Sequence, residues 1–248
     1  MACATMPAFP LPAFAMSRIH RETHNLHNAG WLRAAVLGAN DGLISTAGLV
    51  VGMSAAGTEL NTLLLTAAAG LTAGAFSMAA GEYVSVSSPA EVEKADRATE
   101  ERELAERPEF ELQELTAIYQ QRGLSPVLAA QVARELTAKD ALAAHLRDEL
   151  GITGHNEARP LQAALASAAA FVVGALLPIL IVLLYRGPGL TTALIGATLA
   201  MLAVLGAVAA RLGGAPMLPG AARVLFWGAL AMGASALIGK LFGAGPIG

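Results

Sequence analysis

Five long apolar stretches constrain the fold of this chain more than any other feature. They lie at residues 34–58, 60–81, 161–185, 190–210 and 224–239. About 20 apolar residues in a helix span the hydrocarbon core of a bilayer, which is about 30 Å thick. Four stretches reach that length, and Arg223 and Lys240 lengthen the fifth by extending their charges toward the headgroups. The sequence therefore predicts an all-α membrane protein with five transmembrane helices.

Charge is concentrated in one segment between the second and third stretches. Of the 35 Asp, Glu, Lys and Arg residues, 24 lie between Pro89 and Arg159, and 15 of these are acidic. An excess of acids argues against nucleic acid and favours cationic partners. We expect four regions: an N-terminal tail (1–29), transmembrane helices 1 and 2 (30–88), a cytosolic helical metal-binding domain (89–160), and transmembrane helices 3 to 5 (161–248).

Start and stop signals divide the polar insert into three helices. The first should continue the direction of the second span through Pro89 to about Glu106. A second is expected at about 109–121, before Gly123. The third should open at Ser125 and Pro126, break near Lys139 and close at Gly151.

Basic residues predict the orientation of the chain in the membrane. With five crossings, 14 of the 16 Lys and Arg residues fall on one side, and only Arg186 and Lys240 fall on the other. Because basic residues favour the cytoplasmic side, we place the N-terminus and the insert in the cytoplasm. The first residues read as a tail rather than a signal peptide, and either Met1 or Met16 can be the start. Alanine and glycine richness suggests a bacterial inner membrane.

Two side chains in the first two stretches, and one directly after the second, are candidates for an ion pathway. Asp41 lies within an apolar span, where a carboxylate costs about 2.5 to 3.5 kcal/mol, and it shares a helix face with Gly38 and Ser45. Met78 and Glu82 are four residues apart on the next span. Carboxylates and a thioether suit a divalent transition metal. The alternatives are that Asp41 hydrogen-bonds a neighbouring helix, that Met78 fills the core, and that Glu82 is solvated.

The insert offers a second set of candidate metal ligands, paired at helical spacing. These residues are Glu100 with Glu103, Glu111 with Glu114, and His145 with Glu149. Stacked carboxylates repel unless a cation lies between them, and carboxylate with imidazole suits iron or manganese. The alternative is that the acids form solvated helix faces. His20, His24 and His27 of the tail are a weaker candidate, and the single cysteine, Cys3, excludes a cysteine cluster.

Several motifs resemble the vacuolar iron transporter family. They are GWLRAAVLGANDG (30–42), SMAAGEYVSVSS (77–88), ELAE (103–106), AIY (117–119), AKDAL (138–142) and DELG (148–151), and the resemblance runs from about His20 to the C-terminus. It implies a homodimer with five membrane helices per subunit and an ion pathway at the dimer interface. It also implies a cytosolic domain that gathers metal, and export of ferrous iron from the cytosol in exchange for protons, with manganese or other divalent ions also carried.

The resemblance also assigns residues. Asp41 and Met78 match intramembrane pathway positions, and five glutamates of the insert fit those of the family's metal-binding domain: Glu100, Glu103, Glu111, Glu114 and Glu149. His145 and Leu146 stand where plant members carry methionines, so the number of metals bound and their selectivity stay open. The expected function is a bacterial-type metal transporter, not an enzyme, with no resident cofactor. The alternatives are a membrane-anchored ferritin-like di-iron oxidase and a metal-sensing adaptor without transport.

Overall fold

The computed structural model describes residues 29–152, 158–185, 187 and 189–243, and every regular element in these ranges is a helix. The predicted tail, with His20, His24 and His27, lies outside the described residues apart from its last position. The helices are α1 (Ala29–Ala55), α2 (Leu60–Glu106), α3 (Pro108–Gln121), α4 (Pro126–Asp148), α5 (Pro160–Leu184), α6 (Leu190–Leu212) and α7 (Met217–Gly243).

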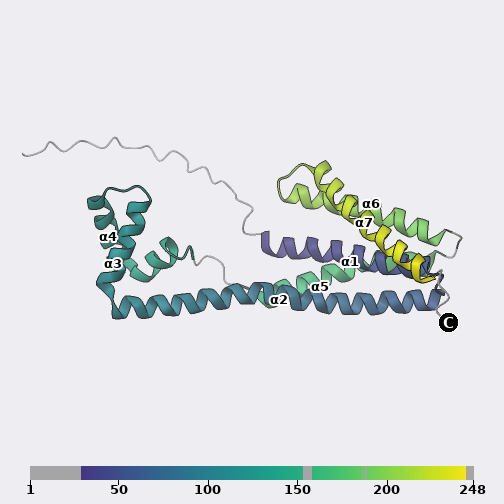
Figure 1. Ribbon diagram of the computed structural model, residues 1–248, viewed down its shortest axis with the longest axis horizontal. Coiled ribbons are helices and arrows are strands. Elements are labelled where there is room, and N and C mark those ends of the chain that lie inside the picture. The colour runs from purple at the N-terminus through teal and green to yellow at the C-terminus, as the bar shows by residue number, and fades with distance from the viewer. Residues whose placement is uncertain (1–28, 153–157, 186, 188, 244–248) are drawn as a thin grey trace, which may run out of the picture.

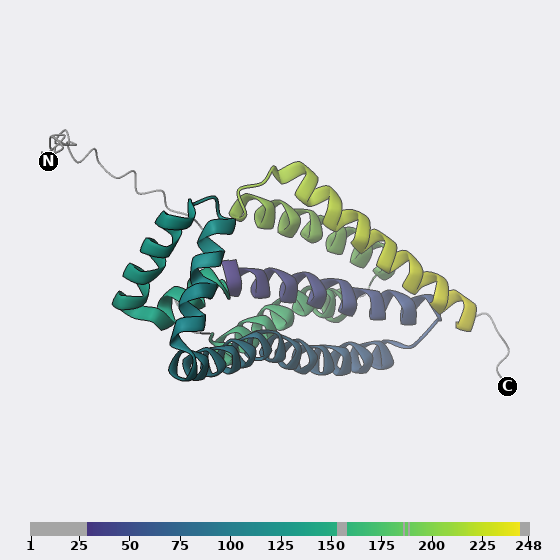
Figure 2. The same cartoon turned by 60° about the vertical axis from the view of Figure 1, so that its left-hand side comes forward.

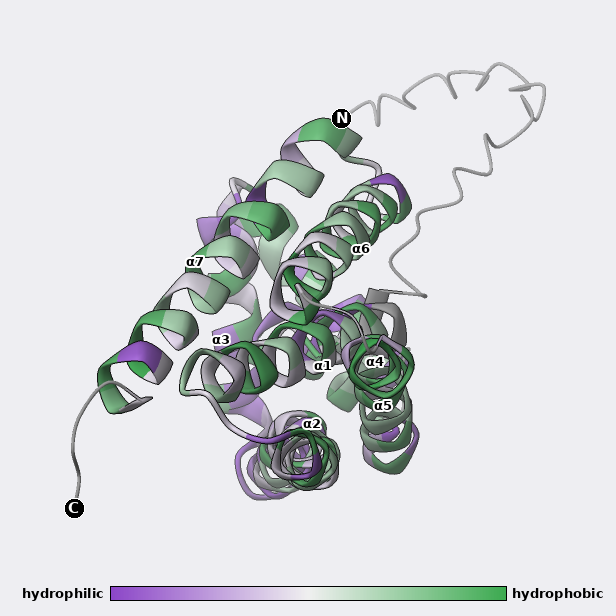
Figure 3. Cartoon of the chain, turned by 90° about the vertical axis from the view of Figure 1, so that its right-hand side faces the viewer, coloured by the Kyte–Doolittle hydropathy of each residue, from purple (hydrophilic) through white to green (hydrophobic). Residues whose placement is uncertain are grey.

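Five of these helices are long and apolar enough to cross a membrane: α1, α2, α5, α6 and α7. The all-α class with five spans is therefore confirmed. In Figures 1 and 2 they form one bundle, with α1 running between α5 and the α6–α7 pair. Most of their length is apolar (Figure 3), and many of their large apolar side chains are exposed. The fifth helix is 27 residues long rather than the 16 uncharged residues of the sequence pattern, because helical hydrogen bonding continues past the charges of Arg223 and Lys240.

Helix α2 connects the bundle to the insert without interruption. It has 47 residues and contains Pro89, as expected from the sequence. At 1.5 Å per residue it is about 70 Å long, more than twice the thickness of the hydrocarbon core. Its second half, 82–106, therefore projects beyond the membrane, and Figure 1 shows α3 and α4 at the far end of this projection.

Small residues bring the membrane helices into close contact. A Cβ atom at Gly38 or Gly42 of α1 would overlap the backbone of α5 near Phe171, and a Cβ atom at Gly74 of α2 would overlap the Phe171 ring. Gly70 likewise meets the side chain of Leu49. Close approach through small residues is the usual way that helices associate in lipid. Gly70 and Gly74 thus serve contacts within one chain.

Candidate metal centre

The insert folds around a small apolar core between α3 and α4. Leu115 and Tyr119 of α3 pack against Ala129, Ala133 and Ala144 of α4, and all five residues are buried. This spacing of three to four residues gives each helix one apolar face. The core holds the two helices as a hairpin at the end of α2.

A break inside α4 turns its last two turns back toward α2. Asp140 has extended backbone angles (φ −167°, ψ 94°), and its Oδ1 accepts a hydrogen bond of 2.9 Å from the backbone N–H of Ala143. Asp140 thus caps the helical segment 141–148, which is the usual role of aspartate at a helix start. The segment ends before Gly151, whose φ of +71° is left-handed. The structure places the break next to Lys139, where the sequence predicts it.

Four potential ligands meet where these elements converge. Glu100 of α2, Glu111 of α3, His145 of α4 and Glu149 just after α4 each offer a donor atom, and the four atoms lie within 4.8 Å of one another. Glu100, Glu111 and His145 are 3%, 4% and 0% exposed, whereas Glu149 is exposed toward solvent. Such burial is rare for carboxylates unless they are paired or bind a cation.

Distances around His145 fit coordination of a single ion. Its Nδ1 lies 3.1 Å from Glu100 Oε1, 3.1 Å from Glu149 Oε2 and 3.9 Å from Glu111 Oε2. Donors that each lie about 2.1 Å from a transition metal are about 3.0 to 3.4 Å apart. Small side-chain movements would therefore allow these residues to bind one divalent cation.

Burial and mutual repulsion make the carboxyl groups of this cluster hard to ionise. Burial, and then the charge of Glu149, raise the pKa of Glu100 to about 7, although His145 acts in the opposite direction. Burial, and then Glu114, also raise the pKa of Glu111. A divalent cation would favour the charged forms of both groups, because its field offsets both causes.

Two buried polar atoms of the cluster lack a hydrogen bond. They are His145 Nε2 and Glu100 Oε1. Buried polar atoms without partners are costly, and clusters of them need a specific explanation. Glu100 Oε1 lies 3.1 Å from His145 Nδ1 without forming a hydrogen bond, and a cation bound among the carboxylates would coordinate this oxygen, so the donor set fits a metal.

The other two predicted ligands lie beside the four-residue group rather than in it. Glu103 and Glu114 are half-buried, and their charges contribute to the raised pKa values of Glu100 and Glu111 respectively. Their carboxylates increase the negative field at the mouth of the cluster. The structure therefore brings together four of the six residues that the sequence suggests.

Contacts with Phe171 of α5 show how deep the pathway candidates of the first two spans lie in the bundle. Gly42 of α1 and Gly74 of α2 both meet Phe171, and Gly70 of α2 meets the side chain of Leu49, so Asp41 lies level with residues 74–78 of α2. Along α2, Glu82 is then about 6 to 12 Å closer to the insert. Asp41 and Met78 thus lie at a similar depth in the bundle, and Glu82 lies nearer the insert.

Asp41 itself lies on the outside of the single chain. The residue is exposed, while the neighbouring Gly38 and Gly42 face α5. Ser45 donates a hydrogen bond of 2.6 Å to the backbone carbonyl of Asp41, not to its carboxylate. Gly38 and Gly42 therefore make the close contact with α5, and Asp41 lies on the outer surface of the bundle.

Sequence reasoning did not identify a group of residues that supports the cluster. Tyr119 of α3 and Arg122, the first residue after α3, both bond to Asp148, beside Glu149. Burial acts to raise the pKa of Asp148, but hydrogen bonds from Arg147, Tyr119 and Arg122 hold it well below its usual range. The motifs AIY and DELG contain two of these residues, yet nothing in their spacing indicates that they meet.

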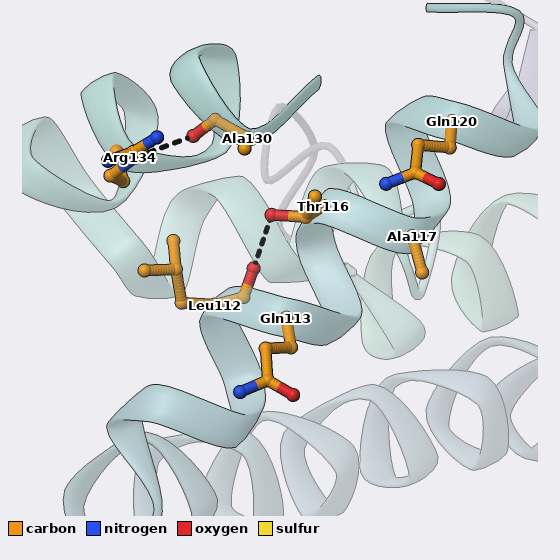
Figure 4. Close-up of a pocket in the computed structure, with 7 residues that line it drawn as sticks. All are labelled: Leu112, Gln113, Thr116, Ala117, Gln120, Ala130 and Arg134. Atoms are coloured by element: carbon orange, nitrogen blue, oxygen red, sulfur yellow. Dashed lines mark hydrogen bonds between the residues drawn. The ribbon is translucent and has the colours of Figure 1, made fainter. Parts of the chain in front are cut away.

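A hollow of about 430 Å³ lies between α3 and α4 (Figure 4). Its lining consists of Leu112, Gln113, Thr116, Ala117, Gln120, Ala130 and Arg134. Helical periodicity places these α3 residues on the side opposite Glu111. The lining contains no acid, so the hollow is separate from the candidate metal centre.

Comparison with known proteins finds relatives that match most of the chain. The sequence profile described as VIT family matches residues 32–240. A "Vacuolar iron transporter" from Acanthamoeba castellanii is 47% identical over 224 residues, covering 90% of this chain and 82% of that protein. "Vacuolar iron transporter homolog 2" from Arabidopsis thaliana is 35% identical, covering 86% of this chain and 85% of that protein. "VIT-like transporter 1b" from Glycine max is 33% identical, covering 98% and 93% respectively.

Proposed function

The chain belongs to the VIT family, and from this premise we propose that it exports ferrous iron from the cytosol in exchange for protons. Its relatives are named transporters, so it is a membrane transporter of metal ions and not an enzyme. Manganese is a second proposed substrate, since carboxylate and imidazole bind both ions. The observation that carries the proposal is the group of Glu100, Glu111, His145 and Glu149, of which all but Glu149 are buried.

In this mechanism the insert captures the metal. Glu103 and Glu114 attract a cation to the cluster, and the four donors replace part of its hydration shell. The positive charge of the bound cation offsets the repulsion among the three carboxylates, so capture needs no further cationic side chain. Because Glu149 is the exposed member of the group, the ion enters and leaves on its side.

Transfer through the membrane uses Glu82, Met78 and Asp41 in that order. The position of Glu82 between the insert and the level of Asp41 and Met78 supports a route of about one to two helical turns from the cytosolic edge to mid-bundle. Protonation of Asp41 and Glu82 from the far side would weaken their hold on the metal and reset the carrier. Acids within membrane spans commonly serve such proton-coupled steps.

The exposure of Asp41 supports a homodimer. A carboxylate facing lipid near mid-membrane costs about 2.5 to 3.5 kcal/mol, and a second subunit that covers α1 and α2 would remove that cost. The membrane half of α2 also exposes large apolar side chains, Leu65 and Phe76 among them. We therefore propose that the ion pathway lies between two copies of this chain, as the family resemblance implies.

Orientation and location complete the proposal. The distribution of Lys and Arg supports a cytoplasmic N-terminus and insert. The expectation of a bacterial inner membrane depends on composition alone and stays a prediction, since the relatives named above come from an amoeba and from plants.

The di-iron oxidase alternative finds little support in the cluster. Di-iron bundles supply Glu-x-x-His pairs from two helices, whereas the single donor group found among the described residues contains one histidine and three glutamates. An adaptor that senses metal without transport would leave an acid in the first span unexplained.

Flux into proteoliposomes tests the proposal. The purified chain is reconstituted, and entry of ferrous iron, manganese and zinc is measured with and without a proton gradient. We expect iron flux that increases when the compartment receiving the metal is acidic. Metal binding with no flux under either condition would favour the adaptor, and oxygen consumption coupled to iron oxidation would favour the oxidase.

A further inference from the structure

Asp148 is the centre of a dense hydrogen-bond network at the end of α4. Tyr119 Oη donates to its Oδ2 at 2.6 Å, and Arg122 Nη1 donates to its Oδ1 at 2.5 Å. The other terminal nitrogen of Arg122, Nη2, donates to the backbone carbonyl of Asp148 at 2.7 Å. Arg147 also donates to Oδ2. The end of α3 thus holds the end of α4 through both its side chain and its main chain.

This network acts on the segment that carries two of the four metal donors. Residues 141–149 form a short piece of chain after the break at Asp140, and they include His145 and Glu149. Asp140 caps one end of the segment, and Asp148 holds the other. The Asp148 carbonyl belongs to the peptide bond that leads into Glu149, so Arg122 restrains the backbone of a donor residue directly.

The geometry points to a specific role: we propose that Asp148, held by Tyr119 and Arg122, is the positioning residue of the metal centre. It keeps His145 and Glu149 opposite Glu100 and Glu111, and it does so without contacting the ion. The inference rests on the proposed function, because it assigns the support of the same metal-binding group. It is independent of the direction of transport and of the ion carried.

Repulsion within the cluster explains why such an anchor is needed. Three carboxylates converge on His145, and without a cation their charges push the most exposed one, Glu149, toward solvent. Beyond Ala144, which joins the core of α3 and α4, the segment has one other buried apolar side chain, Leu146. Loss of the Asp148 network would therefore release the α4 donors, while Glu100 and Glu111 stay on their own helices.

Manganese binding by the full-length chain in detergent tests the role of Asp148. Affinity is measured by titration, and pulsed electron paramagnetic resonance detects ¹⁴N modulation from an imidazole bound to Mn²⁺. Asp148→Asn should lower affinity about 10- to 100-fold, the usual effect of losing outer-shell support, and should remove the ¹⁴N modulation from the remaining bound ion. Tyr119→Phe, which loses one hydrogen bond to a charged group, should lower affinity about tenfold.

Arg97→Gln provides the matched control. It removes the exposed ion pair between Arg97 and Glu101 in the same part of the molecule, so both affinity and ¹⁴N modulation should stay at wild-type values. Helical content by circular dichroism shows that each variant is folded. If Asp148→Asn does not fold, Tyr119→Phe decides the question, because it removes only a hydroxyl group.

The possible negative results distinguish the positioning role of Asp148 from the metal centre itself. Wild-type affinity and modulation in Asp148→Asn, or in Tyr119→Phe where that variant decides, would overturn the positioning role alone. Weaker binding with undiminished ¹⁴N modulation would also overturn it, because His145 would still reach the ion. No Mn²⁺ binding, or no ¹⁴N modulation, in the wild-type chain would overturn the proposed metal centre and this inference with it.

Discussion

The acids of the insert and the acid of the first span have opposite surroundings. Glu100 and Glu111 are enclosed by three helices of their own chain, and His145 stands between them. Asp41 is on the outer surface of the bundle, and its closest described hydrogen bond involves its backbone. One chain therefore completes the candidate capture site, whereas the membrane carboxylate needs a second surface. Four experiments address this difference.

Asp41→Asn should have the largest effect on transport and none on capture. Removing the charge removes the proposed ion ligand in the membrane, so we expect iron flux to fall at least about 100-fold, since losing a charged partner costs about 3 to 5 kcal/mol at a site that the second subunit would bury. Flux is measured in proteoliposomes under a pH gradient, and Mn²⁺ binding by the insert is measured on the same preparation. Glu59→Gln, which removes an exposed acid before α2, is the control. Transport by Asp41→Asn at the wild-type rate would remove the basis of the proposed pathway.

Glu111→Gln should have its main effect on metal capture by the insert. It removes a buried carboxylate donor, so Mn²⁺ affinity should fall about 100-fold, at the upper end of the loss expected from an outer-shell change. Glu109→Gln removes an exposed acid from the same helix and should leave the affinity unchanged. Equal effects of the two variants would mean that only net charge attracts the ion, and that the cluster is not a site.

The pH dependence of binding separates the buried cluster from exposed acids. The pKa of Glu100 is raised to about 7, so below pH 7 the metal must displace a proton from it. Mn²⁺ affinity should fall about tenfold per pH unit from 7 toward 5 and change little above pH 7.5. Calorimetric titrations between pH 5.5 and 8 measure this slope. A flat profile down to pH 5.5 would contradict the raised pKa and the enclosure that causes it.

The smallest of the four effects is expected for Glu100→Gln in the absence of metal. There the substitution should increase the free energy of unfolding. The folded chain binds a proton at Glu100 up to pH 7 and the unfolded chain only up to about 4.5, so stability falls as pH rises through this interval. The neutral variant avoids that loss, and we expect it to gain about 1 to 3 kcal/mol at pH 8 and little at pH 4.5. Thermal unfolding at the two pH values checks the sign. Destabilisation at pH 8 would show that the carboxylate is satisfied without a cation.

Much of the fold follows from local sequence. The apolar stretches, the passage of α2 through Pro89 and the break near Lys139 are all predicted, because each depends on residues within a few positions of one another. The uncharged stretch 224–239 is shorter than α7, because it stops at Arg223 and Lys240 whereas the helix continues past both. A charge near the headgroups ends the apolar pattern but not the helix.

The candidate site is only partly predictable, because local spacing does not show which helix faces meet. Spacing of three or four residues identifies pairs of acids on one helix face, but it cannot tell which member of a pair faces another helix. Glu100 and Glu111 face the cluster, while Glu103 and Glu114 lie beside it. The bond between Tyr119 and Asp148 joins residues 29 positions apart and leaves no periodic signal.

Hydropathy and charge along the chain were sufficient to determine an all-helical membrane protein with an acidic insert, because the cost of placing charge in hydrocarbon acts residue by residue. Tertiary structure alone decided that three carboxylates and one imidazole converge, that α3 anchors the end of α4, and that Asp41 faces outward. Those outcomes depend on the rotation and crossing of packed helices, which close contacts such as that of Gly74 with Phe171 determine over long sequence separations.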